Sequence, residues 1–305
     1  MDQDAPREGL RQSLLSVPAR PVLGLVCGDP AGVGPELILR CLTDPALPDG
    51  VDFRLIGREE GHTPGQPTPE SARAAWDALE EAAGFLQDGT IQAVVTGPVH
   101  KESLHAIGFP FPGQTEFFAA RSGTENFAMC LTGGPLTVAL ATIHVPMRDV
   151  PRLLRADEIV RVGKLLHGFL QRRLGRAPRI AVAGLNPHAG EHGRFGDEEQ
   201  TIIAPAVTEL AAQGTFTGPL SPDTVFHRAA NGQFDGVLCM YHDQGLIPLK
   251  LLAFDTGVNV TLGLPFPRTS PDHGTAFDLA GTGRANHRSM LAAIDLAAEM
   301  LRSKS

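Results

Sequence analysis

In the stretch Ile180-Ala181-Val182-Ala183-Gly184-Leu185-Asn186-Pro187-His188-Ala189-Gly190-Glu191, an apolar segment is followed closely by a histidine. The run from Ile180 to Ala183 predicts a buried strand. This strand ends at Asn186-Pro187, because proline has no amide hydrogen for a further ladder bond. His188 is therefore expected on a loop just past the carboxyl end of a core strand, which is where open α/β sheets place their ligands.

The same arrangement occurs twice more. The apolar run 136–143 is followed by His144, and the run 236–241 is followed by His242. If the three strands are neighbours in one sheet, or lie in facing sheets of two subunits, the imidazoles can converge on a borderline divalent ion such as zinc or cobalt. A single histidine of this kind is more often hydrogen-bonded to the loop backbone. Its repetition at three strand ends favours the metal interpretation.

Length and charge indicate the broad class of protein and the partners that it disfavours. A chain of 305 residues exceeds the size at which single cores stop growing, so two lobes are expected. The formal charge of −8 argues against sequence-independent binding of nucleic acid or anionic lipid, but it is compatible with a local basic pocket.

The cysteines and the amino terminus indicate the compartment. Cys27, Cys41, Cys130 and Cys239 have no short pairwise spacing, which predicts buried thiols in a reducing compartment. The amino terminus has no secretory core segment, and no run approaches membrane-spanning length. We expect a cytoplasmic protein without a membrane partner.

Strand-like and helix-like segments alternate along the chain, which predicts an α/β protein with largely parallel sheets and flanking helices. Gly133-Gly134 predicts a hairpin between two of the strands. The expected strands are 21–27, 53–57, 91–96, 127–131, 136–143, 180–183, 236–241 and 258–262. The expected helices are one up to about 43, then 70–86, 156–173, 198–212, 244–254 and 286–302.

Three loops are ambiguous on their own. The glycines between Gly28 and Gly34 do not have the spacing of the dinucleotide fingerprint, so a tight strand-to-helix turn is an equal interpretation. Thr115 opens a helix, where it is either a phosphate contact or a plain N-cap. Asp223 is either a helix cap or a support for a metal-binding histidine.

Long blocks of the sequence resemble the 4-hydroxythreonine-4-phosphate dehydrogenase family, which serves pyridoxal phosphate biosynthesis. The blocks follow one another from about Gly24 to the end of the chain, in the order found in that family. They are Gly28-Asp29-Pro30-Ala31-Gly32-Val33-Gly34-Pro35, Thr96-Gly97-Pro98-Val99-His100-Lys101, Gly113-Gln114-Thr115-Glu116-Phe117-Phe118, Leu185-Asn186-Pro187-His188-Ala189-Gly190-Glu191, Tyr241-His242-Asp243-Gln244-Gly245-Leu246, Gly257-Val258-Asn259-Val260-Thr261-Leu262-Gly263-Leu264-Pro265-Phe266, Arg268-Thr269-Ser270 and Asp272-His273-Gly274-Thr275-Ala276.

The resemblance implies a metal site and a substrate site. One divalent ion per subunit, zinc, cobalt or magnesium, is held by His144, His188 and His242 at a homodimer interface. The implied contacts of the phosphorylated substrate are Gln114, Thr115, Lys250, Asn259 and Arg268. At position 114 the family commonly has histidine, and glutamine can still donate a hydrogen bond to phosphate but cannot become cationic.

A second, wider similarity concerns the cofactor. The segment 273–286 is similar to the adenosine-binding loop of isocitrate and isopropylmalate dehydrogenases, which also lack the dinucleotide fingerprint. This similarity implies NAD or NADP as cofactor, without deciding between them. The implied contacts are His273, Gly274, Ala276 and Asn286.

The expected architecture is two-lobed, with a cleft between the lobes as in those dehydrogenases. Residues 21–126 with 255–305 form a cofactor-side lobe, and 127–254 form a second lobe with the metal histidines and the dimer interface. Residues 1–20 form a loose amino-terminal arm.

The implied reaction oxidises the secondary alcohol of 4-phosphooxy-L-threonine with NAD(P) and then releases CO2, leaving 3-amino-2-oxopropyl phosphate. Lys250 and Asp243 are the candidate catalytic residues, although each is also a plausible surface or capping charge. Three alternatives stay open: a dehydrogenase of 4-phospho-threonate or 4-phospho-erythronate, a metal-dependent hydrolase, and a non-catalytic sensor of phosphorylated ligands.

Overall fold

The structure is a computed structural model that describes residues 20–57 and 60–302. The predicted amino-terminal arm therefore lies outside the described residues, except for Arg20. Ten strands form one sheet: β1 (Val22–Val26), β2 (Asp52–Ile56), β3 (Ala93–Thr96), β4 (Ala128–Gly133), β5 (Leu136–Leu140), β6 (Arg179–Ala183), β7 (Thr215–Leu220), β8 (Gly236–Cys239), β9 (Val258–Leu262) and β10 (Arg268–Pro271).

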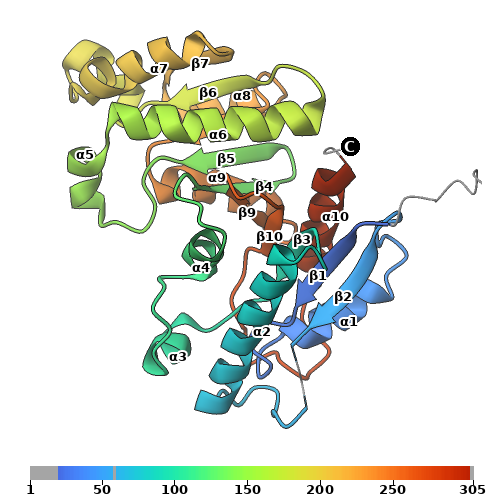
Figure 1. The fold of residues 1–305 in the computed structure, drawn as a ribbon. Coiled ribbons are helices and arrows are strands. Elements are labelled where there is room, and N and C mark those ends of the chain that lie inside the picture. Colours follow the sequence, from blue (N-terminus) through green and yellow to red (C-terminus); the bar gives the residue numbers. More distant parts are fainter. Residues whose placement is uncertain (1–19, 58–59, 303–305) are drawn as a thin grey trace, which may run out of the picture.

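Helices cover this sheet (Figure 1). They are α1 (Gly34–Leu42), α2 (Pro69–Gln87), α3 (Lys101–Ala106), α4 (Gln114–Arg121), α5 (Val150–Leu153), α6 (Ala156–Leu174), α7 (Ala204–Ala211), α8 (Pro222–Ala230), α9 (His242–Ala253) and α10 (Arg288–Arg302). Three short helical turns lie at Met147–Asp149, Pro187–Gly193 and Glu199–Ile203. No helix in the described part of the chain is long and apolar enough to cross a membrane.

The α/β class with mostly parallel strands is confirmed. The strand order is β2-β1-β3-β10-β9-β4-β5-β8-β6-β7, parallel toward both ends and antiparallel at β10–β9, β9–β4 and β4–β5. The sheet is continuous, where separate sheets were expected, because β4 and β9 pair along their length and join the two halves. Strands from 21–126 and 255–305 fill one half of the sheet, and strands from 127–254 fill the other (Figure 1).

Local sequence explains the best-predicted elements. Thr68 and Ser71 form a reciprocal capping box at the start of α2, and α6 ends at Gly175 in the left-handed conformation, with φ 66°. The predicted hairpin turns at Gly134, whose φ is 52°.

Other boundaries differ from the prediction. The expected helix 198–212 is a π-turn at Glu199–Ile203 followed by α7, because Pro205 has no amide hydrogen for the helical ladder. The helix expected at 244–254 begins at His242, so the strand before it is shorter than expected. The strand expected at 136–143 ends at Leu140. The short elements α3, β7 and β10 were not predicted.

Candidate functional site

The three histidine loops lie at one edge of the sheet. β5, β8 and β6 are adjacent and mutually parallel, so their carboxyl ends, which precede His144, His242 and His188, share that edge. The condition stated from the sequence, that the three strands be neighbours, is met.

Buried polar contacts tie these loops together. The hydroxyl of Thr142 donates to the carbonyl of Met240 at 2.7 Å. The side-chain amide of Gln244 accepts from the Met240 N–H and donates to the Gly184 carbonyl, both at 2.7 Å. Gln244 thus links the end of β8 to the end of β6, which fixes the spacing between the loops of His242 and His188.

His144 and His242 face each other, with ring centroids 5.4 Å apart. Partial loss of hydration lowers the pKa of His144, and the positive charge of Lys101 adds to this effect. His144 is therefore held toward the neutral form that a metal ion requires. Nδ1 of His242 lies 2.7 Å from a carboxylate oxygen of Asp243, which leaves Nε2 of His242 available as a ligand atom.

His188 is exposed and stands apart from this pair. Its Nδ1 lies 4.0 Å from a carboxylate oxygen of Asp223, too far for a hydrogen bond. Its φ is 54°, and the residues that follow it also adopt the left-handed backbone conformation. This conformation costs about 1–2 kcal/mol for each residue that is not glycine. Within residues 20–57 and 60–302, no three His, Cys, Asp or Glu side chains gather closely enough to hold a metal ion.

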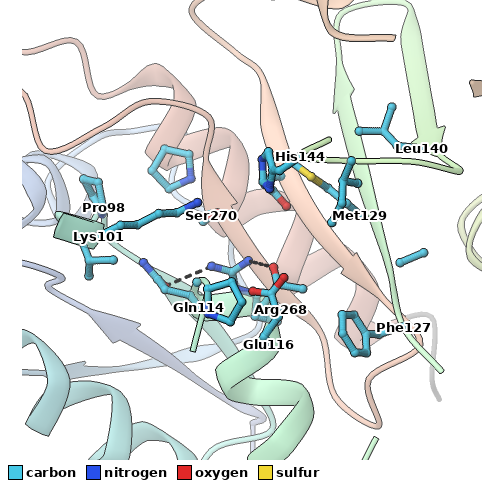
Figure 2. A pocket seen from close by; sticks show the side chains of 18 of the residues that line it. Pro98, Lys101, Gln114, Glu116, Phe127, Met129, Leu140, His144, Arg268 and Ser270 are labelled. Carbon is cyan, nitrogen blue, oxygen red and sulfur yellow. Dashed lines mark hydrogen bonds between the residues drawn. The ribbon is translucent and has the colours of Figure 1, made fainter. Parts of the chain in front are cut away.

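A cavity of about 560 Å³ lies beside His144. Figure 2 shows Arg268 and Gln114 on one side of it and His144 on the other. Seven of the predicted site residues line this cavity: Gln114, Thr115, His144, Asn259, Arg268, His273 and Gly274.

Arg268 gives the cavity its electrostatic character. Its side chain is buried, and the guanidinium donates to Thr96 at 2.8 Å and to Gln114 at 3.1 Å, with longer contacts to Thr115 and Thr261 at 3.4 and 3.3 Å. All four acceptors are neutral, and Nε of Arg268 has no partner in the described residues.

Burial lowers the pKa of Arg268 to about 10, and the negative charge of Glu116 opposes this effect only in part. A buried guanidinium without a carboxylate partner is a site for an anion. The side-chain oxygen of Asn259, buried on the same cavity wall, also has no partner among the described residues.

A second cavity, of about 360 Å³, adjoins the first through His273 and Gly274, which line both. The other two predicted cofactor contacts, Ala276 and Asn286, also line it, and its wall includes the apolar side chains Val33, Leu37 and Leu279. Lys250 lies in this second cavity, with Nζ 3.1 Å from a carboxylate oxygen of Asp272. The structure therefore separates Lys250 from the arginine with which it was expected to share the phosphate.

Sequence reasoning missed several residues of the first cavity. Lys101 and Glu116 line it, and Thr96 and Thr261 accept hydrogen bonds from Arg268. Thr261 had a visible signal, because residues two apart on a strand face the same side and Asn259 was already a candidate. Thr96 had none beyond its place at the end of β3.

The fold defines the architectural class of the protein. The chain is similar in fold to isocitrate dehydrogenase from Methylococcus capsulatus, with a TM-score of 0.53 over 93% of this chain and 86% of that one, at 15% identity. The architecture is therefore that of the isocitrate dehydrogenase type, as predicted.

Closer relatives identify the family. A family model described as pyridoxal phosphate biosynthetic protein PdxA matches residues 44–297. The chain is 45% identical to 4-hydroxythreonine-4-phosphate dehydrogenase of Geobacter metallireducens, over 93% of this chain and 97% of the relative. It is 38% identical to the crystal structure of the Klebsiella pneumoniae enzyme of that name, with a TM-score of 0.78 over 92% of this chain and 99% of that one. The chain belongs to the PdxA family, and the predicted resemblance is confirmed.

Proposed function

We propose that this chain is a metal-dependent, NAD(P)-linked dehydrogenase of 4-phosphooxy-L-threonine. It oxidises the secondary alcohol and releases CO2, giving 3-amino-2-oxopropyl phosphate for pyridoxal 5′-phosphate synthesis. The observation that carries this proposal is the buried guanidinium of Arg268, which lacks an anionic hydrogen-bond partner and opens on a cavity shared with His144. The names of the relatives support the same activity.

The phosphate of the substrate binds at Arg268. The guanidinium offers Nε, which is otherwise unpartnered, and the hydroxyl of Thr115 and the amides of Gln114 and Asn259 surround the same space. Because both polar atoms of Gln114 are already bonded, to Arg268 and to the Gly97 carbonyl, this side chain holds the arginine in place as well as facing the phosphate.

Two of the three predicted histidines are placed as a pair of ligands for a divalent ion. Two imidazoles face each other, one is held toward neutrality, and the other is supported at Nδ1 by Asp243. His144, His188 and His242 would hold the ion, and zinc, cobalt or magnesium bound there would polarise the alcohol oxygen of the substrate.

The second cavity fits a nicotinamide cofactor. Its apolar walls suit an adenine ring, and the loop residues His273, Gly274, Ala276 and Asn286 border it. Lys250 lines this cavity, with Nζ 3.1 Å from a carboxylate oxygen of Asp272, and its neutral amine form would accept the proton that the alcohol loses on oxidation. Asp243 acts through His242, whose ring it orients.

The active enzyme is a homodimer. Ile247 and Leu251 on α9 and Phe254, its C-cap residue, are 66%, 82% and 79% exposed, and their spacing places them on one face of the helix. This face belongs to the helix that begins with His242, so a second copy packed on it lies next to the metal histidines. The halves 21–126 with 255–305 and 127–254 act as the two lobes. The four buried free cysteines accord with a cytoplasmic location.

The test compares substrates and cofactors in one assay. Reduced nicotinamide is followed with NAD or NADP and either 4-phosphooxy-L-threonine, 4-phospho-threonate or 4-phospho-erythronate, before and after chelation and metal return. We expect turnover of the amino acid substrate that chelation abolishes. Preferential turnover of a tetronate would transfer the proposal to that substrate, and activity unchanged by chelation would remove the metal. Consumption of a substrate in a parallel reaction without nicotinamide, followed by chromatography, would favour a hydrolase.

A further inference from the structure

The loop that carries His188 has an unusual backbone. Six consecutive residues, 188–193, have positive φ, between 45° and 92°, and only two of them are glycine. The others include His188 itself. Side chains disfavour this left-handed conformation, so the loop keeps it only if surrounding contacts over-determine it.

A buried carboxylate lies beneath this loop. Glu199, 3% exposed, accepts the backbone N–H groups of Leu185 and Asn186 at 2.7 Å each, both through Oε1. Its Oε2 accepts the side-chain amide of Asn186 at 3.0 Å. These contacts hold the two residues through which the chain leaves β6 and enters the left-handed turn.

Glu199 is also packed against the turn itself. A Cβ added to Gly190 would lie 2.7 Å from Oε2 of Glu199, and one added to Gly184 would lie 3.1 Å from Oε1. The carboxylate therefore fills the space enclosed by the loop and meets its backbone on two sides. No salt bridge to a described cation involves Glu199, so its negative charge is balanced by N–H dipoles of the loop.

We propose that Glu199 is a positioning residue: its buried carboxylate sets the left-handed loop 188–193 and thereby presents the imidazole of His188 at the edge shared with His144 and His242. This inference depends on the metal role proposed for His188, and it adds the residue that prepares that ligand before the ion arrives. The sequence separates the two by a loop, and only the fold brings the carboxylate against the backbone on both sides of the histidine.

Two variants and one control test the proposal in the full chain. Glu199→Ala removes every acceptor for the two N–H groups, whereas Glu199→Gln keeps one acceptor oxygen for them. Asp197→Asn changes an exposed carboxylate two residues earlier and serves as the matched control. The readouts are backbone hydrogen exchange of 184–193 without metal, and the affinity for Co²⁺ by dialysis and visible absorption.

We expect faster exchange confined to 184–193 and a loss of Co²⁺ affinity of at least about tenfold in Glu199→Ala, with Glu199→Gln between it and the wild type. Asp197→Asn should match the wild type in both measurements. If Glu199→Ala does not fold, the comparison of Glu199→Gln with Asp197→Asn decides the question: Glu199→Gln should show faster exchange of 184–193 and weaker Co²⁺ binding than Asp197→Asn. Unchanged exchange and unchanged affinity in Glu199→Gln and Glu199→Ala would overturn the proposal.

The exchange measurement separates this proposal from the proposed function. If the wild-type protein binds no Co²⁺, the metal role of the histidines fails. Exchange in the metal-free protein still reports directly on whether Glu199 holds the loop. Unaltered protection in the variants would then refute the positioning role on its own evidence.

Discussion

Replacing Arg268 by methionine should abolish substrate use while leaving the unliganded protein folded. Burial lowers the pKa of the guanidinium to about 10, which corresponds to a cost of about 3 kcal/mol for keeping it charged in the fold. Its two shorter hydrogen bonds, to Thr96 and Gln114, return about 3–6 kcal/mol together, because the donor is charged. These contributions largely offset each other, so the free energy of unfolding of Arg268→Met should lie within about 3 kcal/mol of that of the wild type.

Activity responds differently, because the phosphate of the substrate is the missing partner of this cation. Losing a buried, hydrogen-bonded charge pair costs about 3 kcal/mol or more, which lowers kcat/KM by at least about 100-fold. Arg161 also lines the cavity but is already paired with Glu158, so Arg161→Met is the matched control, with an expected loss under about tenfold.

The assay combines steady-state kinetics with thermal unfolding in increasing inorganic phosphate. Phosphate should raise the unfolding temperature of the wild type and of Arg161→Met but not that of Arg268→Met. Equal protection of all three proteins, or a kcat/KM of Arg268→Met within tenfold of the wild type, would show that the anion binds elsewhere.

Three further outcomes are expected. Asp243→Asn should weaken Co²⁺ binding by about 10–100-fold, measured by dialysis, because the carboxylate supports Nδ1 of His242; unchanged affinity would make Asp243 a plain surface residue. Leu251→Glu should give monomers in sedimentation, since this side chain is 82% exposed on the proposed dimer face; an intact dimer would place the interface elsewhere. Asp235→Asn should lower the unfolding free energy at pH 7 by about 1–3 kcal/mol, because Arg176 holds the pKa of Asp235 well below 3.8. That stability is present above pH 3.8 and is lost as pH falls through the lowered pKa, so urea unfolding of the two proteins should converge in acid.

Elements with a strong local signal could be predicted from the sequence. The 19-residue helices α2 and α6 were placed within about one residue, because their apolar spacing, caps and terminal glycine act locally. The four-residue strand β10, Arg-Thr-Ser-Pro, has no apolar alternation and ends in proline, so only its pairing with β3 and β9 defines it. This strand carries Arg268, which the sequence therefore offered as a substrate contact only through the family resemblance.

In the candidate site, too, only the features with a local sequence signal could be predicted. Strand-end histidines can be read from the sequence because a buried strand is a local pattern. The environment of Arg268 cannot, because its partner Thr96 is 172 residues away in the chain. The left-handed turn at His188 also has no local signal: four of its six residues disfavour positive φ, and the carboxylate beneath it belongs to the next element.

The burial of Arg268 also explains why this position requires arginine. Burial brings the guanidinium to a pKa of about 10, which still leaves it fully cationic in neutral solution. The ordinary pKa of lysine is already near 10.4, and the same burial would lower it further, toward the physiological range. Its single ammonium also cannot reach Thr96 and Gln114 while keeping a donor for the phosphate in the geometry that the planar guanidinium provides. Arginine at this position therefore keeps a buried cation beside the cavity in neutral solution, and binding of an anionic substrate compensates for the solvation that folding removed.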